Sequence, residues 1–218
     1  MNMANQHEQN AKSVERSVQT LQQFHSTIVA LAIGSGAEKF LSSLKGGEDA
    51  AIPFIVVAMS VAFLSTIVPF YHGMSRHLYE AHVTKSVMGS GGHAVPLLLD
   101  IFTFIIEAGL LVAMSRALDT PQMFLFYWSG LLFVDILWSL VVWRIQKSEK
   151  PLWAANNFAC LLVAWLVWLC LPLLLSTMQL LDDRQIRITM VMAIALIEVS
   201  RSVMDYKKNW KFYFPWST

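Results

Sequence analysis

The sequence predicts an all-α fold: a polytopic bundle of about six transmembrane helices with both ends of the chain in the cytoplasm. Of its 218 residues, 56% are hydrophobic and only 14% are charged, whereas soluble domains carry about 25% charged residues. The mean hydropathy is +0.51, which does not suit a surface that faces water. At about 20 residues per span, a chain of this length has room for about six spans and little else.

Composition also predicts where the protein resides and how it is organised. The formal net charge of +1 gives no reason to expect nucleic-acid binding, which shows as a basic excess. Residues 1–23 are polar and lack the short apolar core of a cleavable signal. We therefore expect a multi-pass protein of the plasma (inner) membrane whose first partner is the lipid bilayer. Residues 1–20 form an amphipathic cytoplasmic lead-in, residues 21–206 a six-helix membrane domain, and residues 207–218 a cytoplasmic tail.

Six apolar stretches define the expected spans. They cover approximately residues 21–41, 51–71, 95–117, 121–143, 152–178 and 187–206. The first is expected to continue the lead-in helix without a break. Pro69 should kink the second near its end, after which helix resumes to about Lys85. Pro121 suits the first turn of the fourth, because proline is favoured at the first helical position.

Lys and Arg are unevenly distributed between the two sides of the predicted membrane. Ten lie on the side of the chain ends and five on the other, with Arg201 left out because it lies inside a span. Because cytoplasmic segments carry the excess of these residues, both termini are predicted to be cytoplasmic. The ten are Lys12, Arg16, Arg76, Lys85, Arg144, Lys147, Lys150, Lys207, Lys208 and Lys211, and the five are Lys39, Lys45, Arg116, Arg184 and Arg187.

Ionisable residues lie well inside the predicted spans. Each costs at least about 2.5 kcal/mol at the centre of a membrane helix, so each needs a structural or functional reason. In the predicted orientation they crowd the cytoplasmic half, whereas the outer half is almost purely apolar. We therefore predict a polar cavity that opens to the cytoplasm and is lined by Asp100, Glu107, Asp135 and Glu198. The other polar residues of this half are Arg201, Asn156, Asn157, His25 and His72.

Helical spacing groups some of these residues. Asp100 and Glu107 are seven residues apart and share one face of their helix. Glu198, Arg201 and Asp205 follow at intervals of three and four, so they can form an acid–base–acid ladder. The alternative is a purely structural role, in which buried polar groups hold the helices together through hydrogen bonds and Arg201 neutralises one carboxylate.

Histidine spacing argues against a metal site. His72, His77 and His82 are five residues apart, so successive rings rotate by about 140° around a regular helix and cannot all face one ion. His77 and Glu80 have a spacing found in carboxylate-bridged metal sites, but only one such pair is present. We expect an interfacial histidine cluster, and no metal or cofactor.

The tail that follows the last span is basic and aromatic. Lys207, Lys208 and Lys211 suit anionic lipid headgroups, at about 1 kcal/mol each, and Trp210 suits the membrane interface. We expect these four residues to anchor the tail at the membrane. The alternative is a specific contact with a protein partner.

Three functions fit these patterns. The intramembrane carboxyl groups favour a gated ion- or proton-conducting channel or compact transporter, expected to be a homo-oligomer because a bundle of this size has little room for a pore. The alternative is a non-catalytic sensor or accessory subunit that recruits a cytoplasmic protein partner. The third is a membrane enzyme that acts on lipid. No phosphate-binding loop, serine nucleophile elbow or cysteine ligand set occurs in the sequence, so the expectation leans away from an enzyme.

Overall fold

The computed structural model describes residues 3–46, 51–84, 94–146, 152–177, 182–214 and 216, and this part of the chain contains helices and no strands. Six helices are long: α1 (Met3–Gly46), α2 (Ile52–Leu78), α4 (Ala94–Arg116), α5 (Pro121–Gln146), α6 (Leu152–Thr177) and α7 (Asp183–Lys208). The π-helical turn η1 (Tyr79–Thr84) continues α2, and the one-turn helix α8 (Trp210–Tyr213) follows α7.

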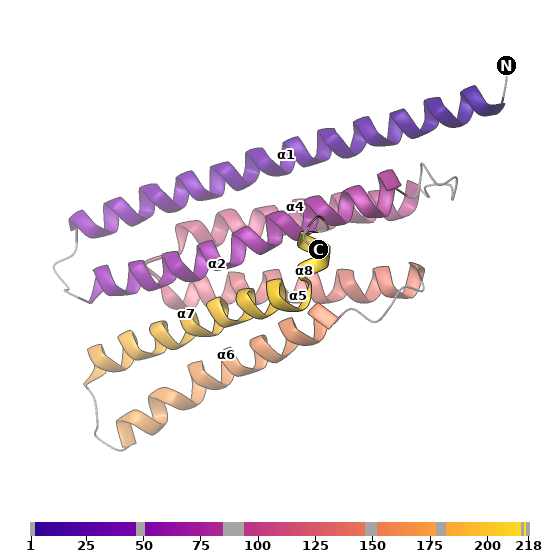
Figure 1. Cartoon of the computed structure of the whole chain (residues 1–218). Coiled ribbons are helices and arrows are strands. Elements are labelled where there is room, and N and C mark those ends of the chain that lie inside the picture. The colour runs from indigo at the N-terminus through magenta and orange to yellow at the C-terminus, as the bar shows by residue number, and fades with distance from the viewer. Residues whose placement is uncertain are drawn as a thin grey trace.

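The six long helices lie side by side in a single bundle and alternate in direction (Figure 1). α1 packs on α2 and α4, and α4 packs on α5; α7 lies between α2 and α6. α8 turns back and contacts α2. The N-terminal part of α1 extends beyond the other helices (Figure 1). At 1.5 Å per residue, even the shortest long helix measures about 35 Å, which exceeds the hydrocarbon core of a bilayer at about 30 Å.

Each of the six predicted spans falls on one long helix, and four of the six are long and apolar enough to cross a membrane. These four are Ile52–Thr84, Leu97–Arg116, Pro121–Arg144 and Ala154–Ser176. The helices α1 and α7 carry more polar residues and do not meet that criterion. The predicted lead-in and first span form one continuous helix, and α5 begins at Pro121 as predicted. Pro69 lies inside α2, and helical structure continues after it through Leu78 and η1 to Thr84, close to the expected end at about Lys85.

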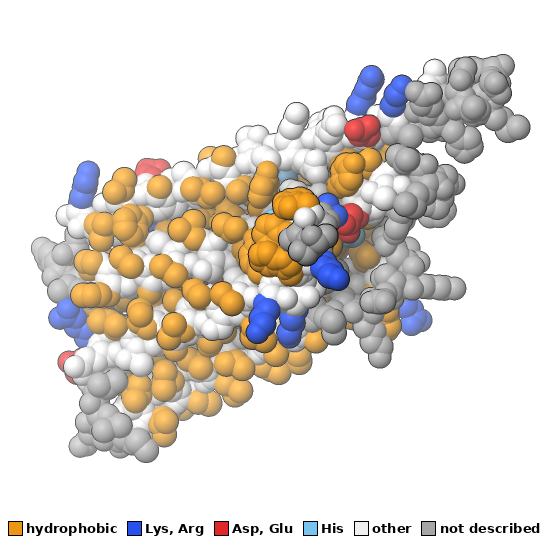
Figure 2. Space-filling view, viewed as in Figure 1, with side chains coloured by type: hydrophobic (Ala, Val, Ile, Leu, Met, Phe, Trp, Pro, Cys, Tyr) orange, Lys and Arg blue, Asp and Glu red, His pale blue; other side chains and the backbone are white. Residues whose placement is uncertain are grey.

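In the second half of α7 the polarity is reversed from that of a helix on a water-soluble protein. Its inward face buries Glu198, Arg201 and Asp205. Its outward face exposes apolar side chains, including Leu196 at 62% and Val203 at 60%. A surface helix in water places its apolar stripe toward the core and its charges outward. This arrangement therefore suits apolar surroundings. Figure 2 shows hydrophobic side chains over most of the visible face between the two ends of the bundle.

The two ends of the bundle differ in their interiors. The main apolar core is built around Met59, Leu111, Phe124 and Trp128, and it occupies the end where α1 and α6 finish. At that end Lys39 of α1 forms a 2.6 Å ion pair with Asp119 in the turn between α4 and α5. Partial burial would raise the pKa of Asp119, but Lys39 and Thr120 outweigh it and hold that pKa below its usual value.

Local sequence explains where α7 begins. Asp182 precedes its first turn, and the Asp182 carboxylate accepts a 2.7 Å hydrogen bond from the backbone N–H of Gln185. The side-chain oxygen of Gln185 accepts a 3.1 Å hydrogen bond from the backbone N–H of Asp182. This reciprocal capping box satisfies two backbone donors that have no partner inside the helix. The cap fixes the start of α7, and hence the position of Glu198 and Arg201 four turns further on.

Candidate functional site

A buried ion pair between Glu198 and Arg201 forms the centre of the polar half. Glu198 is 0% and Arg201 3% exposed. The guanidinium Nη2 donates to Glu198 Oε1 at 2.7 Å, and Nε donates to Oε2 at 2.9 Å. Two other helices satisfy the same carboxylate: Thr66 of α2 donates to Oε1 at 2.9 Å, and Trp128 of α5 donates to Oε2 at 3.0 Å. The pair is therefore fully hydrogen-bonded, as a buried charge pair must be to be tolerated.

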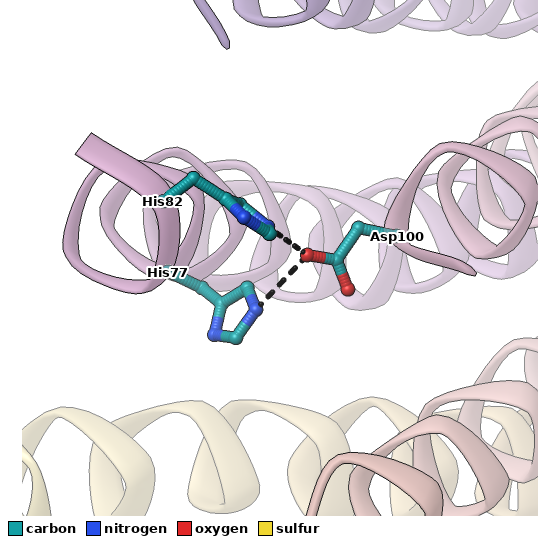
Figure 3. A group of neighbouring side chains, drawn as sticks. All are labelled: His77, His82 and Asp100. Carbon is teal, nitrogen blue, oxygen red and sulfur yellow. Dashed lines mark hydrogen bonds and ion pairs between the residues drawn. The ribbon is translucent and has the colours of Figure 1, made fainter. Parts of the chain in front are cut away.

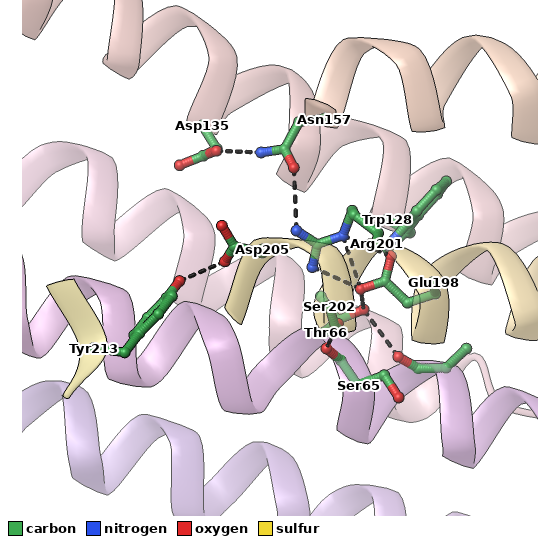
Figure 4. A network of polar contacts seen from close by, with 11 residues as sticks. Ser65, Thr66, Trp128, Asp135, Asn157, Glu198, Arg201, Ser202, Asp205 and Tyr213 are labelled. Atoms are coloured by element: carbon green, nitrogen blue, oxygen red, sulfur yellow. Dashed lines mark hydrogen bonds and ion pairs between the residues drawn. The ribbon is translucent and has the colours of Figure 1, made fainter. Parts of the chain in front are cut away.

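The network continues from Arg201 across the bundle (Figure 4). Arg201 Nη1 donates to Asn157 Oδ1 of α6 at 3.1 Å. The amide Nδ2 of Asn157 donates to Asp135 Oδ2 of α5 at 2.5 Å. Ser202, next to Arg201, donates to the backbone carbonyl of Ser65 in α2. One chain of hydrogen bonds thus joins α2, α5, α6 and α7.

A cavity of about 180 Å³ lies beside this network. Its ionisable or phenolic lining residues are His77, Glu107, Asp135, Arg201, Asp205 and Tyr213, and apolar residues including Phe70 and Phe104 complete the wall. The volume accommodates several water molecules, and the site has enough polar groups to hold them.

Glu107 is the most unusual group in the wall of the cavity. It lies on α4, is 3% exposed, and faces the cavity. Among the residues that the structure describes, Glu107 has no hydrogen-bond or ion-pair partner. The Asp135 carboxylate binds the neutral amide of Asn157, and Asp205 binds the neutral groups of Asn209 and Tyr213. Because Arg201 is paired with Glu198, the cavity has an excess of carboxyl groups.

The C-terminal tail forms part of the wall of this cavity. Asn209, Phe212 and Tyr213 belong to its wall, and the Tyr213 hydroxyl donates to Asp205 Oδ2 at 2.5 Å. Burial, helped by the charge of Asp205, raises the pKa of Tyr213 far above its usual value, so this hydroxyl keeps its proton and remains a donor. A Cβ atom at Gly73 would lie 3.3 Å from the hydroxyl, which shows how closely the tail approaches α2.

The second polar cluster joins the end of α2 to α4 and α5. Asp100 of α4 is 2% exposed, and its Oδ1 accepts a 2.8 Å hydrogen bond from Trp138 of α5. Its Oδ2 lies 2.6 Å from His82 Nε2 and 3.3 Å from His77 Nε2 (Figure 3). The rings of His77 and Trp138 contact edge-to-face, with centroids 4.6 Å apart. The cluster borders the cavity, because His77 and Trp138 belong to both.

The structure distributes the predicted cavity residues over three places. Glu107, Asp135, Asn157 and Arg201 do line the cavity. Glu198 instead faces Thr66, Trp128 and Arg201, and Asp100 faces the two histidines. The Glu198–Arg201 step of the predicted ladder is present, whereas Asp205 turns to Tyr213.

Three other predicted residues lie apart from the cavity wall. His25 is buried against Tyr71 and Phe104. His72 packs on Tyr206 and Tyr213. Asn156 precedes Asn157 on α6 and is not part of the lining. The predicted tail anchors are exposed, namely Lys207, Lys208, Trp210 and Lys211; residues 215, 217 and 218 of the tail lie outside the described part of the chain.

Sequence reasoning missed His77, His82, Trp138 and Tyr213. The expectation for the histidines assumed a regular α-helix, but the chain forms a π-helical turn over Tyr79–Thr84. Hydrogen bonds in a π-helix run from residue i to i+5, so residues five apart come to one side. The spacing of five between His77 and His82 was therefore the available signal. Tyr213 lay within a tail that its composition marked only as interfacial.

Comparison with models of known protein families, with curated proteins and with solved structures found no match.

The buried ion pair predicts a specific pattern of stability. Arg201→Gln leaves Glu198 buried and charged without its cation, and removing one partner of such a pair costs about 3–5 kcal/mol. Glu198→Gln should also destabilise the protein, whereas the double variant Glu198→Gln/Arg201→Gln should recover much of the loss because no unpaired charge remains. The measurement is the thermal unfolding midpoint of the purified protein in detergent.

The matched control for this cycle is Arg76→Gln. It removes a guanidinium from the more exposed pair with Glu80, so the stability should change by no more than about 1 kcal/mol. Equal losses for Arg201→Gln and Arg76→Gln, or additive losses in the double variant, would contradict the assigned role of the pair.

Proposed function

We propose that this chain is a six-span membrane protein with both termini in the cytoplasm, and that it is a gated proton- or cation-conducting channel or compact transporter. The observation that carries the functional part is Glu107, a buried carboxyl group that faces a cavity without a hydrogen-bond or ion-pair partner among the described residues. An isolated buried charge is too costly to persist. Such a group needs either a proton or a nearby cation, and the cavity has room for both.

Six spans rather than four are supported by the packing of α1 and α7. α7 lies between two apolar helices and is long enough to cross a bilayer. Three of its charges, Glu198, Arg201 and Asp205, are buried on its inward face. Its other charges lie near its two ends, and outward residues between them, such as Leu196 and Val203, are apolar. α1 likewise exposes Leu31, Leu41 and Leu44 on its outer side. The excess of Lys and Arg on the side of the chain ends supports cytoplasmic termini.

The charge of the cavity supports cations over anions. Arg201 is the only Lys or Arg in the described wall, and Glu198 neutralises it. Glu107, Asp135 and Asp205 have no cationic partner among the described residues. Clefts with one sign of charge and low-dielectric walls concentrate the opposite ion. The same groups can take up and release protons, so the proposal covers protons and small cations as one class.

A gate is supported at each end of the cavity. Toward the proposed outer side, the core around Trp128 and Phe124 is apolar, and its described residues offer no polar path of the kind that an open pore requires. Toward the proposed cytoplasmic side, Tyr213 belongs to the cavity wall and is held there by its hydrogen bond to Asp205. We infer that the tail controls access from the cytoplasm. The cavity is formed by helices of one chain, and the expected homo-oligomer stays a prediction.

The proposed topology is tested by single cysteines placed at both ends of α1 and α7, in a protein whose native cysteines are replaced by alanine. Lys45→Cys and Arg184→Cys should react with a membrane-impermeant maleimide in intact cells, and Lys12→Cys and Lys208→Cys only after permeabilisation. Labelling of positions 12 and 45 from the same side would show that α1 does not span the membrane; the same holds for positions 184 and 208 of α7.

The proposed conduction is tested by flux in liposomes that contain the purified protein and a pH-sensitive dye, with parallel assays under sodium and potassium gradients. Glu107→Gln and Asp135→Asn remove the negative charge with little change in shape, so each should lower the flux at least tenfold. Asp119→Asn makes the same chemical change outside the cavity and should leave the flux within about twofold. No flux from the native protein, or unchanged flux in both cavity variants, would overturn the proposal.

The proposed gate is tested by Tyr213→Phe in the same liposomes. The substitution keeps the ring over Gly73 but removes the hydrogen bond to Asp205. A hydrogen bond to a charged group contributes about 1.5–3 kcal/mol, so its loss should raise the open population and the flux by about tenfold. Tyr206→Phe removes a hydroxyl from the neighbouring ring, which has only a 3.5 Å contact with His72, and should have little effect. Equal flux in native and Tyr213→Phe protein would exclude this gate.

A further inference from the structure

The geometry around Asp100 points to a metal site. We propose that His77, His82 and Asp100 bind one divalent first-row transition-metal ion of the zinc class, beside the cavity and independently of whether the cavity conducts ions. The three residues offer two imidazole nitrogens and a carboxylate oxygen that all lie within 4.8 Å of one another.

The backbone brings the two histidines together. In a regular α-helix they would be about 140° apart, but the π-helical turn starts two residues after His77 and includes His82. Both Nε2 atoms therefore point at the same carboxylate from one helical segment (Figure 3). π-helical turns are rare in proteins, and those that occur are often found at functional sites. The position of this π-helical turn beside the two histidines is the first observation that favours a ligand-binding role.

The carboxylate is held in a way that leaves one oxygen for an ion. Trp138 donates to Oδ1 of Asp100 at 2.8 Å, so this oxygen is oriented by a neutral donor from another helix. Ligating carboxylates in metal sites commonly have such outer hydrogen bonds. Oδ2 faces His77 and His82 and receives no other described donor. The second observation is therefore that Trp138 holds Oδ1 and leaves Oδ2 directed at the two histidines.

The third observation is an unsatisfied nitrogen. Nε2 of His77 is buried and lies 3.3 Å from Oδ2 of Asp100, yet it makes no hydrogen bond with any described residue. His82 already occupies Oδ2 at 2.6 Å. With His82 bound to Asp100, His77 has only the 3.3 Å contact with Asp100 and no hydrogen bond at Nε2 among the described residues, whereas an ion between the three residues would use the lone pair of each. Buried polar atoms without partners are costly, and a metal ion removes that cost.

One ligand distance already fits a small divalent ion, and a second needs a modest change. A tetrahedral ion with bonds of about 2.0–2.1 Å holds its ligand atoms roughly 3.3 Å apart. The His77–Asp100 separation of 3.3 Å already has this value, and the His82–Asp100 separation of 2.6 Å would widen by about 0.7 Å. Imidazole with carboxylate suits zinc and its first-row neighbours, whereas magnesium and calcium prefer oxygen ligands alone.

Three protein ligands leave a tetrahedral ion with a fourth position for a water or another small ligand. His77 also belongs to the cavity wall, so the proposed ion lies next to that space. It adds positive charge close to the carboxyl groups of the cavity. The site has the ligand count of an exchangeable or reactive metal centre rather than that of a closed structural one.

The test is direct binding to the purified full-length protein in detergent, with any purification tag removed and metals stripped by a chelator. Zinc is titrated in competition with a chromophoric indicator. One equivalent should bind to the native protein. His77→Gln, His82→Gln and Asp100→Asn should each weaken zinc binding more than about tenfold. Trp138→Phe should weaken it less, by about tenfold. Magnesium should not compete.

The matched control is His72→Gln, the same substitution five residues earlier on α2 and outside the cluster. It should bind zinc as the native protein does. A second measurement does not depend on the stability of these variants: His77→Cys keeps a ligand at the site, so its cobalt complex should gain a thiolate charge-transfer band that the native complex lacks. X-ray absorption of the native zinc complex should show two imidazole ligands.

The proposal is overturned if the native protein binds no zinc, if binding is the same in native, His77→Gln and His82→Gln proteins, or if cobalt in His77→Cys shows no thiolate band. Fewer than two imidazoles in the zinc complex would also overturn it. None of these readouts uses flux, so a failure of the metal site is distinguishable from a failure of the proposed conduction.

Discussion

The rest of the polar half depends on one constraint: the charge of Arg201 must be compensated within the bundle. A guanidinium keeps its proton under all ordinary conditions, so Arg201 cannot lose its positive charge by deprotonation. Glu198 supplies the opposite charge one helical turn away, and α2 and α5 supply donors to the same carboxylate. Asn157 then takes the remaining side of Arg201 and connects it to Asp135. Four helices are thereby held at defined rotations, and the open space beside them is the cavity.

The buried carboxyl groups differ in how many hydrogen-bond partners they have. Glu198 is a structural group because all its hydrogen-bonding capacity is used. Glu107 lies on another helix and faces open space, so its energy depends on what enters the cavity. Buried polar groups in a membrane protein are therefore not of one kind, and the number of their partners separates them. The contacts of Glu198 show the scaffold role, and the proposed site around Glu107 lies beside it in the same half of the bundle.

Much of the fold was predictable, and the reasons are physical. Apolar stretches of about 20 residues marked the helices of the bundle because a bilayer imposes that length. The crowding of Glu107, Asp135 and Arg201 followed from counting residues along those helices. Partner choice was not predictable, because whether Asp205 meets Arg201 or Tyr213 depends on how α8 turns back, and no local pattern encodes that turn. The histidine cluster was missed for a similar reason: a helical wheel presumes 3.6 residues per turn throughout, and the segment at Tyr79–Thr84 departs from it.

The π-helical turn at Tyr79–Thr84 affects the whole rod formed by α2 and η1. A π-helical turn holds one residue more than an α-helical turn, so the side chains on its two sides are out of phase by one position. The stripe of α2 that packs on α7 and the stripe of η1 that faces α1 are thus not one continuous line on the helix. A single rod can in this way present differently directed faces to neighbours at different depths. Removing one residue between positions 77 and 82 would restore one phase along the rod and leave the two imidazoles four residues apart, on the same face of a regular helix.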